Sequence, residues 1–418
     1  MKPDGGRRVV VTGLGVITSL GSDLDGFWSG LLEGRSGVRR ITQFDASNLP
    51  CQIAGEIPEF DPEAYMDAKD VRRTSRASQI SLAVAQLAVA DSGFQVGASD
   101  PERVGVYVGT AIGGIERLED GISVLRGKGA YRLNPFITTS VLPNMLAFHV
   151  GHHFKVFGPS STITTACATG TQVVGEAAEA IRHGRADVII ACAAEALITD
   201  YALGGFAAMR ALPTHFNDEP TRASRPFDAD REGFVFSEGA ACLLLESLES
   251  ARNRGARIYA EISGYAASSE GYHIAAPDPT AAGAVRTMRW ALEDAGVSPE
   301  QVDYINAHGT STPVNDAVET LAIKTLFGER AFQIPVSSTK SMLGHAMGAS
   351  GAIEAVVCAL SIQRGQIHPT INYETPDPEC DLDYVPNLAR AAPISTALSN
   401  SFGLGGQNAC LVLSRMEV

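Results

Sequence analysis

The feature that most constrains the fold is a rough internal duplication. Residues 163–181 and 336–357 each read as a short strand, a turn rich in serine and threonine, a run of small residues and then a helix. Strand and helix patterns alternate in a similar order around both segments, and such alternation implies an α/β layer structure. We therefore predict two similar α/β halves that pack together, residues 1–255 and residues 256–418.

Apolar periodicity places the individual elements. Strands are expected at residues 9–11, 104–109, 161–165, 186–191, 242–245, 259–263, 302–306, 336–338, 397–399 and 409–414. Helices are expected at residues 25–33, 76–92, 282–295 and 349–364, with another that ends near residue 183. Residues 111–160 and 205–240 are expected to be irregular, and Gly13 and Gly15 to form a turn after the first strand. A dinucleotide-binding turn would need a third glycine where Thr18 stands.

Charge and cysteine content restrict the partners. The formal net charge of −14 argues against nucleic acid, which needs a clustered basic surface, and an acidic partner must meet a local basic patch. The seven cysteines are odd in number and form no C-x-x-C pair, so we expect reduced thiols and a cytoplasmic protein. No apolar stretch reaches the roughly 20 residues that span a bilayer, so we expect no membrane segment.

Cys167 is the first candidate for chemistry. It lies where a predicted strand ends and a predicted helix begins, among small residues that leave room for a substrate. A helix N-terminus stabilises a thiolate and lowers its pKa. The local sequence is equally compatible with a buried, inert thiol, which is the interpretation that suits Cys192 and Cys242 in their apolar strands.

Two histidines and a glycine loop strengthen the case for Cys167. His308 directly follows a predicted strand and His345 directly precedes a predicted helix, and glycine flanks both. The ligand spacings of a zinc site, such as C-x-x-C or H-E-x-x-H, do not occur. Residues 400–408 contain three glycines between two predicted strands, and this loop is either a simple hairpin or the source of an oxyanion hole.

Seven motifs together resemble one family over nearly the whole chain. They are Val-Val-Val-Thr-Gly-Leu-Gly at 9–15, Thr-Ala-Cys at 165–167, Ala-Ser-Arg-Pro-Phe-Asp at 223–228, Glu-Gly-Phe-Val at 232–235, Asn-Ala-His-Gly-Thr-Ser-Thr-Pro at 306–313, Ser-Thr-Lys-Ser-Met-x-Gly-His at 338–345 and Asn-Ser-Phe-Gly at 400–403. The chain resembles the elongating β-ketoacyl-[acyl-carrier-protein] synthases, closest to the synthase II group of bacterial fatty-acid synthesis. The resemblance implies the thiolase fold, five αβαβα layers built from two duplicated halves, in a homodimer.

The resemblance also implies a reaction. Cys167, His308 and His345 match the family's catalytic Cys-His-His set. The implied activity is a decarboxylative Claisen condensation of malonyl-[acyl-carrier-protein] with an acyl-enzyme, which elongates chains in type II fatty-acid biosynthesis. It needs no redox cofactor, nucleotide or catalytic metal. Two departures from the family pattern, Ala168-Thr169 after the cysteine and Leu404 in place of an aromatic residue, bear on chain-length preference more than on the reaction.

Further roles follow from the resemblance alone. Lys340 is expected to support His345, and the backbone of Cys167 and Phe402 to form the oxyanion hole, with Phe402 and Gly403 as a gate. Substrate contacts are expected from Thr310, Thr312 and Leu404. Glu354, Asn306 and Asn400 are implied as structural residues near a monovalent cation.

Acyl carrier protein, which is acidic, is the implied partner. The densest basic cluster is Lys69, Arg72, Arg73 and Arg76, and Arg132 and Arg210 are expected to join it as a docking patch. The alternative is that these basic residues form a solvated helix face.

Three other functions are alternatives to this condensation. A polyketide ketosynthase has the same chemistry, a chain-length-factor subunit lacks the nucleophile, and a degradative thiolase has Asn in place of the second histidine and a late cysteine motif that is missing here.

Overall fold

The computed structural model describes residues 6–416. Its ten main strands form two sets of five with the same topology, which confirms the duplication and the thiolase fold that the resemblance implies. The first set has the order β5-β4-β6-β7-β1 and the second the order β10-β9-β13-β14-β8. The strands are β1 (Val9–Ile17), β4 (Val104–Gly109), β5 (Ser160–Ile163), β6 (Val188–Glu195), β7 (Gly239–Ser247), β8 (Ala260–Ser269), β9 (Tyr304–Asn306), β10 (Val336–Ser337), β13 (Thr396–Gly403) and β14 (Gln407–Ser414).

The two sets also share the same pattern of parallel and antiparallel strand pairs. In the first set β4 is parallel to β5 and β6, while β7 is antiparallel to β6 and β1. The second set repeats this, with β9 parallel to β10 and β13, and β14 antiparallel to β13 and β8. A short antiparallel contact joins β1 to β8 at Val10–Glu261 and Val11–Ala260 and makes one ten-stranded sheet of the two sets. The proposed boundary at residue 255 lies between β7 and β8.

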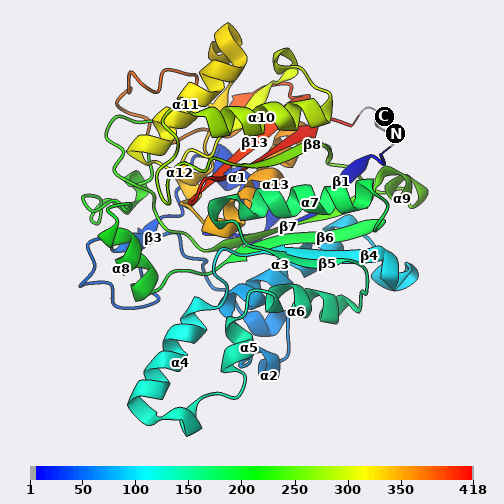
Figure 1. Cartoon of the computed structure of the whole chain (residues 1–418), viewed down its shortest axis with the longest axis vertical. Coiled ribbons are helices and arrows are strands. Elements are labelled where there is room, and N and C mark those ends of the chain that lie inside the picture. Colours follow the sequence, from blue (N-terminus) through cyan, green and yellow to red (C-terminus); the bar gives the residue numbers. More distant parts are fainter. Residues whose placement is uncertain (1–5, 417–418) are drawn as a thin grey trace.

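Helices complete the five layers (Figure 1). Helices α7 (Thr169–Arg182) and α13 (Ser350–Arg364) pack against each other between the two sets of strands. Helix α3 (Arg76–Ser92) covers the outer side of the first set, and α10 (Ala282–Ala295), with α11 (Pro313–Phe327) beside it, covers the second. Residues 350–362 are all buried, because α13 is enclosed on every side, and small residues such as Gly351 and Ala352 allow this.

The first strand differs from the expectation. Gly13 and Gly15 do not form a turn but lie within β1, which is continuous apart from a register shift between Val11 and Gly13. A Cβ atom at Gly13 would lie 2.2 Å from the carbonyl oxygen of Ala88, and one at Gly15 would lie 2.3 Å from that of Val84. Glycine is therefore required because α3 lies directly on the strand.

Two segments expected to be irregular contain helices, and one further long helix was missed. Residues 111–160 hold α4 (Ile115–Lys128), α5 (Ile137–Val141) and α6 (Met145–Phe154), and α8 (Asp200–Ala208) extends into the second segment. α4 does carry apolar residues at helical spacing, Ile115, Leu118, Ile122 and Leu125, but of these only Ile115 is buried. The missed helix, α11, begins at Pro313 after Thr312, a common start signal.

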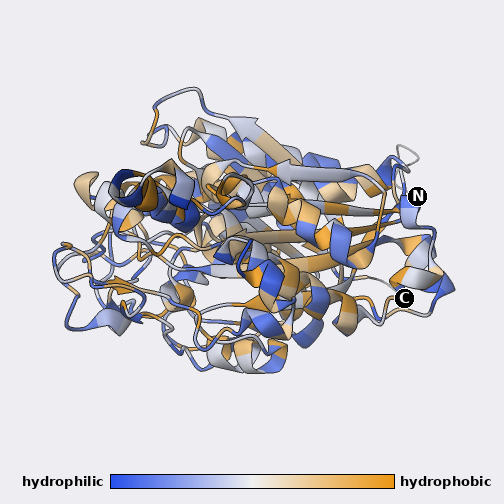
Figure 2. Ribbon diagram, turned by 90° about the horizontal axis from the view of Figure 1, so that it is seen from below, coloured by the Kyte–Doolittle hydropathy of each residue, from blue (hydrophilic) through white to orange (hydrophobic). Residues whose placement is uncertain are grey.

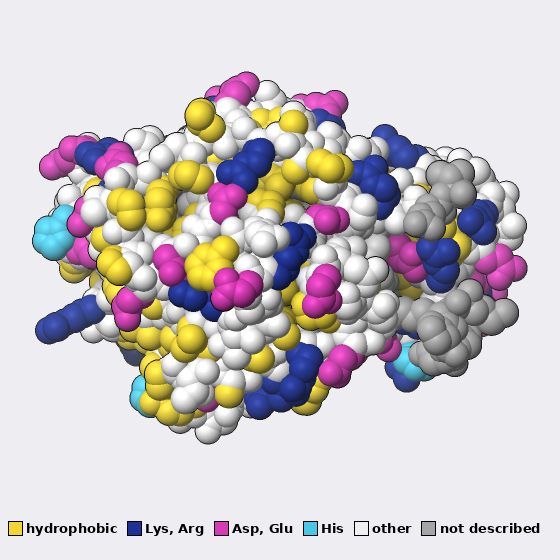
Figure 3. Space-filling view, turned by 90° about the horizontal axis from the view of Figure 1, so that it is seen from above, with side chains coloured by type: hydrophobic (Ala, Val, Ile, Leu, Met, Phe, Trp, Pro, Cys, Tyr) yellow, Lys and Arg dark blue, Asp and Glu magenta, His cyan; other side chains and the backbone are white. Residues whose placement is uncertain are grey.

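The remaining α-helices and strands are short. They are α1 (Leu24–Leu32), α2 (Ala68–Val71), α9 (Leu248–Asn253), α12 (Lys340–Leu343), β2 (Arg39–Arg40), β3 (Ile53–Ala54), β11 (Gln366–Ile367) and β12 (Arg390–Ala391). Apolar residues concentrate on the central strands and on the helix faces that touch them (Figure 2). On the face seen in Figure 3, acidic and basic side chains are interspersed. Within residues 6–416 no helix has the length and apolar character needed to cross a membrane.

Candidate active site

Cys167 lies in a tight turn that both halves of the chain contain. It is the middle residue of the 3-10 turn Ala166–Ala168, which leads into α7, and the turn Met347–Ala349 leads into α13 in the same way. The first residue of each turn has a positive φ, 49° at Ala166 and 43° at Met347, a conformation that costs a non-glycine residue free energy. The duplicated segments therefore share a strained turn that presents the next residue at a helix start, and in the first half that residue is Cys167.

The thiol and the two imidazoles converge in space. The Sγ of Cys167 and one ring nitrogen each of His308 and His345 all lie within 4.8 Å of one another. The histidine ring centroids are 5.5 Å apart, and that of His308 is 5.7 Å from the Phe402 ring. A Cβ atom at Gly403 would lie 2.9 Å from the carbonyl oxygen of Thr165, so the end of β13 rests directly on the turn that carries Cys167.

Burial dominates the electrostatics of the thiol. It raises the pKa of Cys167 to about 11, although the charge of Lys340 and a backbone hydrogen bond at Leu404 both lower it. The net shift is therefore opposite to the one expected at a helix start: backbone hydrogen bonds do lower the pKa, but desolvation of the thiolate outweighs them. At neutral pH the resting residue is a protonated thiol, and its attack on a thioester requires a proton acceptor.

Both histidines are suited to that need because they are neutral. Burial lowers the pKa of His308 and of His345 well below the usual value, and the charge of Lys340 lowers both further. The Nδ1 of His345 lies 2.9 Å from the Oγ of Ser350, while its Nε2 has no partner in the protein. A buried nitrogen without a partner at the cavity wall is available to substrate.

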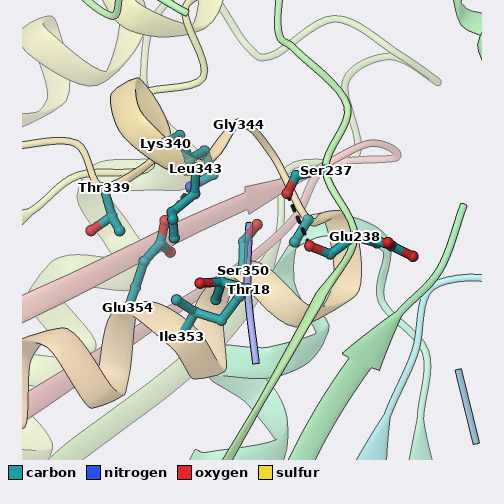
Figure 4. A pocket seen from close by; sticks show the side chains of 11 residues that line it. Thr18, Ser237, Glu238, Thr339, Lys340, Leu343, Gly344, Ser350, Ile353 and Glu354 are labelled. Carbon is teal, nitrogen blue, oxygen red and sulfur yellow. Dashed lines mark hydrogen bonds and ion pairs between the residues drawn. The ribbon is translucent and has the colours of Figure 1, made fainter. Parts of the chain in front are cut away.

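Lys340 is fixed by two contacts rather than free to move. Its Nζ donates to the carbonyl oxygen of His308 at 2.7 Å and to the Oε1 of Glu354. Lys340 therefore acts on His345 only through its charge. Its direct hydrogen bond at the site is with the backbone carbonyl of His308. Lys340 and Glu354 also line a water-sized hollow of about 10 Å³, together with Ser350 and Ser237 (Figure 4).

The catalytic candidates open into a cavity of about 430 Å³, a size typical of small-molecule sites. The wall includes the sequence-predicted residues Cys167, His308, His345, Thr310, Thr312, Phe402, Gly403, Leu404 and Arg210. The hydroxyls of Thr310 and Thr312 lie 2.9 Å apart. The structure therefore brings these distant parts of the chain to one surface.

The residues implied for a monovalent cation offer unsatisfied oxygens. The Oδ1 atoms of Asn306 and Asn400 and the Oε2 of Glu354 are buried and have no hydrogen-bond partner, and the same holds for the Oγ of Ser399. Ser399 pairs with Asn306 between β13 and β9, so two of these residues are neighbours. Amide, hydroxyl and carboxylate oxygens are what a hard cation prefers, so the donor set fits.

The fold leaves some of the predicted docking residues exposed and turns one of them inward. Lys69, Arg72 and Arg132 are exposed, and Arg72 and Arg132 line a surface hollow of about 190 Å³ together with Arg117. The guanidinium of Arg73 lies 4.2 Å from the ring centre of Phe136. Arg76 does not belong to the patch, because its guanidinium turns inward to form two hydrogen bonds, of 2.6 and 2.8 Å, with the fully buried Glu238.

Comparison with known families now identifies the chain. The β-ketoacyl synthase N-terminal domain matches residues 6–251, and the β-ketoacyl synthase C-terminal domain matches residues 259–374. The chain belongs to the β-ketoacyl synthase family.

Individual relatives match this ketoacyl synthase over nearly its whole length. It is 48% identical to the 3-oxoacyl-[acyl-carrier-protein] synthase 2 of Coxiella burnetii and 47% identical to that of Synechocystis, over 98% of this chain and 99% of each relative. A β-ketoacyl synthase from Burkholderia phymatum superimposes with a TM-score of 0.91 at 36% identity, covering 98% of this chain and 100% of that one. The type II polyketide ketosynthase solved with its acyl-carrier protein, AntDE:AntF, superimposes with a TM-score of 0.90 at 37% identity, over 99% and 100% of the two chains.

Two buried glutamates of the ketoacyl synthase site were missed by sequence reasoning. Glu319, on α11, accepts the backbone N–H groups of His308 at 2.9 Å and Gly309 at 2.8 Å. Glu195, at the end of β6, accepts from the backbone of Ala111 at 2.6 Å and of Gly348 at 3.0 Å. Burial raises the pKa of both carboxyls to about 7. The helix-start signal at Thr312-Pro313 would have placed Glu319 in a helix that follows His308.

Proposed function

We propose that this ketoacyl synthase condenses malonyl-[acyl-carrier-protein] with an acyl group held on Cys167, and so elongates chains in type II fatty-acid biosynthesis. The observation that carries the proposal is the convergence of one thiol and two neutral imidazoles, within 4.8 Å of one another, at the wall of a single cavity. The full-length relatives are 3-oxoacyl-[acyl-carrier-protein] synthases, which form products of this class.

The first half-reaction transfers the acyl chain. Cys167 attacks the acyl-carrier thioester as a neutral imidazole accepts its proton, and that proton leaves with the carrier's thiol. The backbone N–H groups of Cys167 and Phe402 stabilise the tetrahedral oxyanion. Loss of one such donor raises the barrier by about 3 kcal/mol. The close contact of Gly403 with the turn that carries Cys167 supports this arrangement.

The second half-reaction forms the carbon–carbon bond. Malonyl-carrier protein loses carbon dioxide, and the enolate that remains is stabilised by N–H groups of His308 and His345. The enolate carbon attacks acyl-Cys167, the carbon–sulfur bond breaks, and the departing thiolate takes up a proton from solvent. The unpartnered Nε2 of His345 supports this role, as does the backbone of His308, held between Glu319 and Lys340.

The test is mass spectrometry of the protein mixed with acyl-carrier protein. We expect a single acyl adduct on Cys167 that malonyl-carrier protein discharges as a 3-oxoacyl product. Cys167→Ala should take up no acyl group. Activity that survives this substitution would refute the proposal. Carriers loaded with chains of different length then define the preference that Leu404 and Phe402 set at the cavity wall.

Two of the other functions differ from this one in a defined way. A chain-length-factor subunit lacks the nucleophile, which this chain retains as Cys167. The polyketide AntDE:AntF ketosynthase is 37% identical to this chain, whereas the 3-oxoacyl-[acyl-carrier-protein] synthases 2 are 46–48% identical. Assay with a polyketide carrier protein beside a fatty-acid carrier protein distinguishes the two pathways, and we expect the faster turnover with the latter.

We propose that the carrier protein docks on the exposed basic residues near α2 and α4. The docking patch then consists of Lys69, Arg72 and Arg132, with Arg73 at its edge and Arg210 at the mouth of the cavity. Opposite charge accelerates such encounters and salt weakens them. The solved complex of AntDE:AntF with its acyl-carrier protein supports a carrier partner for this fold.

The second copy of a homodimer is proposed to pack on the exposed apolar side chains of α4–α6 and on strand β5. Helices α4 and α5 project from the body (Figure 1). Six large apolar side chains in this region are more than a third exposed: Leu118, Ile122, Leu125, Phe136, Leu142 and Phe148. β5 is the edge strand of its set. Sedimentation velocity should therefore give a dimer, and a monomer at micromolar concentration would contradict the proposal.

Two smaller proposals complete the assignment. A monovalent cation is held by the unsatisfied oxygens of Asn306, Glu354, Ser399 and Asn400, and its only expected role is structural. A drop in the melting temperature on replacing potassium by tetramethylammonium would support this cation site.

The cytoplasm is the proposed location, since all seven cysteines are free and buried.

A further inference from the structure

The catalytic set of this synthase is also a ligand set. One sulfur and two imidazole nitrogens lie within 4.8 Å of one another, at the wall of an accessible cavity. Zinc sites that bind substrates use three protein ligands of this kind and leave a fourth position to water. No cysteine or histidine spacing in the sequence predicts such a site, because its three ligands come from three separate turns.

We infer that Cys167, His308 and His345 form an inhibitory site for a thiophilic divalent cation such as Zn²⁺, with the fourth position open to the cavity. Tetrahedral coordination at bonds of about 2.3 Å to sulfur and 2.0 Å to nitrogen requires ligand atoms about 3.3–3.6 Å apart. Closure from 4.8 Å therefore requires side-chain shifts of only about 1 Å, within reach of a rotation of Cys167 and the two rings.

The second observation is the state of His345. It is 2% exposed, and its Nε2 is buried without a hydrogen-bond partner, so this nitrogen can bind a metal in the tautomer that carries the proton on Nδ1. Its Nδ1 lies 2.9 Å from the Oγ of Ser350, which accepts a hydrogen bond from Nδ1–H when Nε2 binds the metal. Metal-binding histidines commonly have such a partner, and its removal weakens binding by about 10-fold or more.

Binding of the metal and the acyl group are mutually exclusive. Coordination consumes the Sγ lone pair that attacks the thioester, and it releases the thiol proton to solvent. Acylation in turn replaces the thiol by a thioester, which is a poor ligand. The two equilibria are therefore linked, and a saturating acyl donor should protect the protein from zinc. This consequence rests on the proposed function, whereas metal binding itself does not.

The test is a titration of Co²⁺ into metal-free protein, followed by its displacement with Zn²⁺. One equivalent should give the near-ultraviolet charge-transfer band of a cobalt–thiolate bond. Cys167→Ser should abolish the band, and His345→Ala should weaken binding by about 100-fold, while Ser350→Ala should weaken it by about 10-fold. Alkylation of Cys167 in the wild-type protein should also abolish the band. This control needs no substitution, so misfolding of a variant cannot explain the loss.

Matched controls are the exposed histidines of α6. The double substitution of His152 and His153 by Gln should leave the band and the affinity unchanged. A band that survives in Cys167→Ser, or after alkylation of wild-type protein, would overturn the inference. Because the titration needs no turnover, a protein that binds cobalt but does not condense carriers contradicts the proposed function alone. A protein that condenses carriers without binding cobalt contradicts only the metal site.

Discussion

At the scale of single residues, burial controls the protonation of the active site. It raises the pKa of Cys167 to about 11 and keeps His308 and His345 neutral. Lys340 acts on all three, since its charge favours the thiolate and disfavours both imidazolium ions. Glu354 balances the charge of Lys340. Burial raises the pKa of the Glu354 carboxyl to about 7.

Replacement of Lys340 by Met should shift the pH profile. Without its charge, the pKa of each imidazole rises toward the ordinary value, so protonation inactivates the enzyme at higher pH than in the wild type. The acid limb of kcat/KM should therefore move to higher pH, and alkylation of Cys167 should slow. Unpairing the buried Glu354 should also destabilise the fold by about 3 kcal/mol.

The control is Lys324→Met, which removes a partly exposed lysine that lies 2.9 Å from Asp381 on the surface. It should change neither the profile nor the alkylation rate, and its effect on stability should stay below about 1 kcal/mol. If the acid limb of Lys340→Met coincided with that of the wild type, the through-space role of Lys340 would be wrong.

Replacement of Glu319 by Gln should separate the two half-reactions. The amide keeps one oxygen and places an NH₂ group against a backbone N–H, so His308 and Gly309 lose half of their anchor. Decarboxylation of malonyl-carrier protein should fall by about 10- to 100-fold, because small displacements of a catalytic group are costly. Acylation of Cys167 should change much less.

Measurement of carbon dioxide release beside acyl-adduct formation tests this partition. Glu329→Gln, an exposed residue just after α11, is the matched control and should alter neither rate. An equal loss of both half-reactions would mean that Glu319 holds the whole site rather than His308.

At the scale of elements, the crossing of α7 and α13 sets the distance between thiol and histidine. Gly170 and Gly351 are each the second residue of their helix. A Cβ atom at Gly170 would lie 2.5 Å from the backbone nitrogen of Ala352, and one at Gly351 would lie 2.4 Å from that of Thr171. The two helices thus touch backbone to backbone, at equivalent positions, directly beyond the turns that carry Cys167 and follow His345.

Gly351→Ala should therefore separate the helices. We expect a loss of about 1–3 kcal/mol of stability and a slower acylation of Cys167, since overpacking forces backbone shifts. Gly127→Ala, in the exposed helix α4 with open space around its Cα, should be neutral or stabilising by up to about 1 kcal/mol. Chemical denaturation and the acylation rate measure both effects. A stable Gly351→Ala protein with normal acylation would show that the crossing tolerates a methyl group.

At the scale of the whole molecule, a net charge of −14 must be overcome locally before an acidic carrier can dock. Charge reversal at Arg72 and Arg132 should raise the KM for carrier protein by about tenfold, equivalent to ~1.4 kcal/mol, and reduce its salt dependence. The kcat should change little, because neither residue lines the catalytic cavity.

The matched control is Arg252→Glu on α9, well away from α2 and α4 (Figure 1). It makes the same charge change and should leave the KM unaltered. Arg76→Met should instead lower stability, because it unpairs the buried Glu238, and should leave salt dependence intact. An unchanged KM in the Arg72 and Arg132 reversal would exclude this docking patch.

The sequence predicted the central elements well and the peripheral ones poorly. Continuous apolar runs such as β7 and the enclosed helix α13 are visible because burial on all sides requires apolar residues throughout. α4 was missed although Leu118, Ile122 and Leu125 stand at helical spacing in its sequence, and the structure leaves all three exposed. Gly13 and Gly15 were misplaced in a turn, because glycine also serves close packing, and only the position of α3 reveals that role.

The sequence by itself determined the duplication, the candidate nucleophile and the two histidines, because local motifs and periodicity encode turns and helix starts. Only the tertiary structure decided the distances and charges. It brought Cys167, His308 and His345 together, turned Arg76 inward to Glu238, and directed Lys340 to the backbone of His308. It also reversed the expected pKa shift of Cys167, because desolvation depends on what surrounds a group and not on its neighbours in the chain.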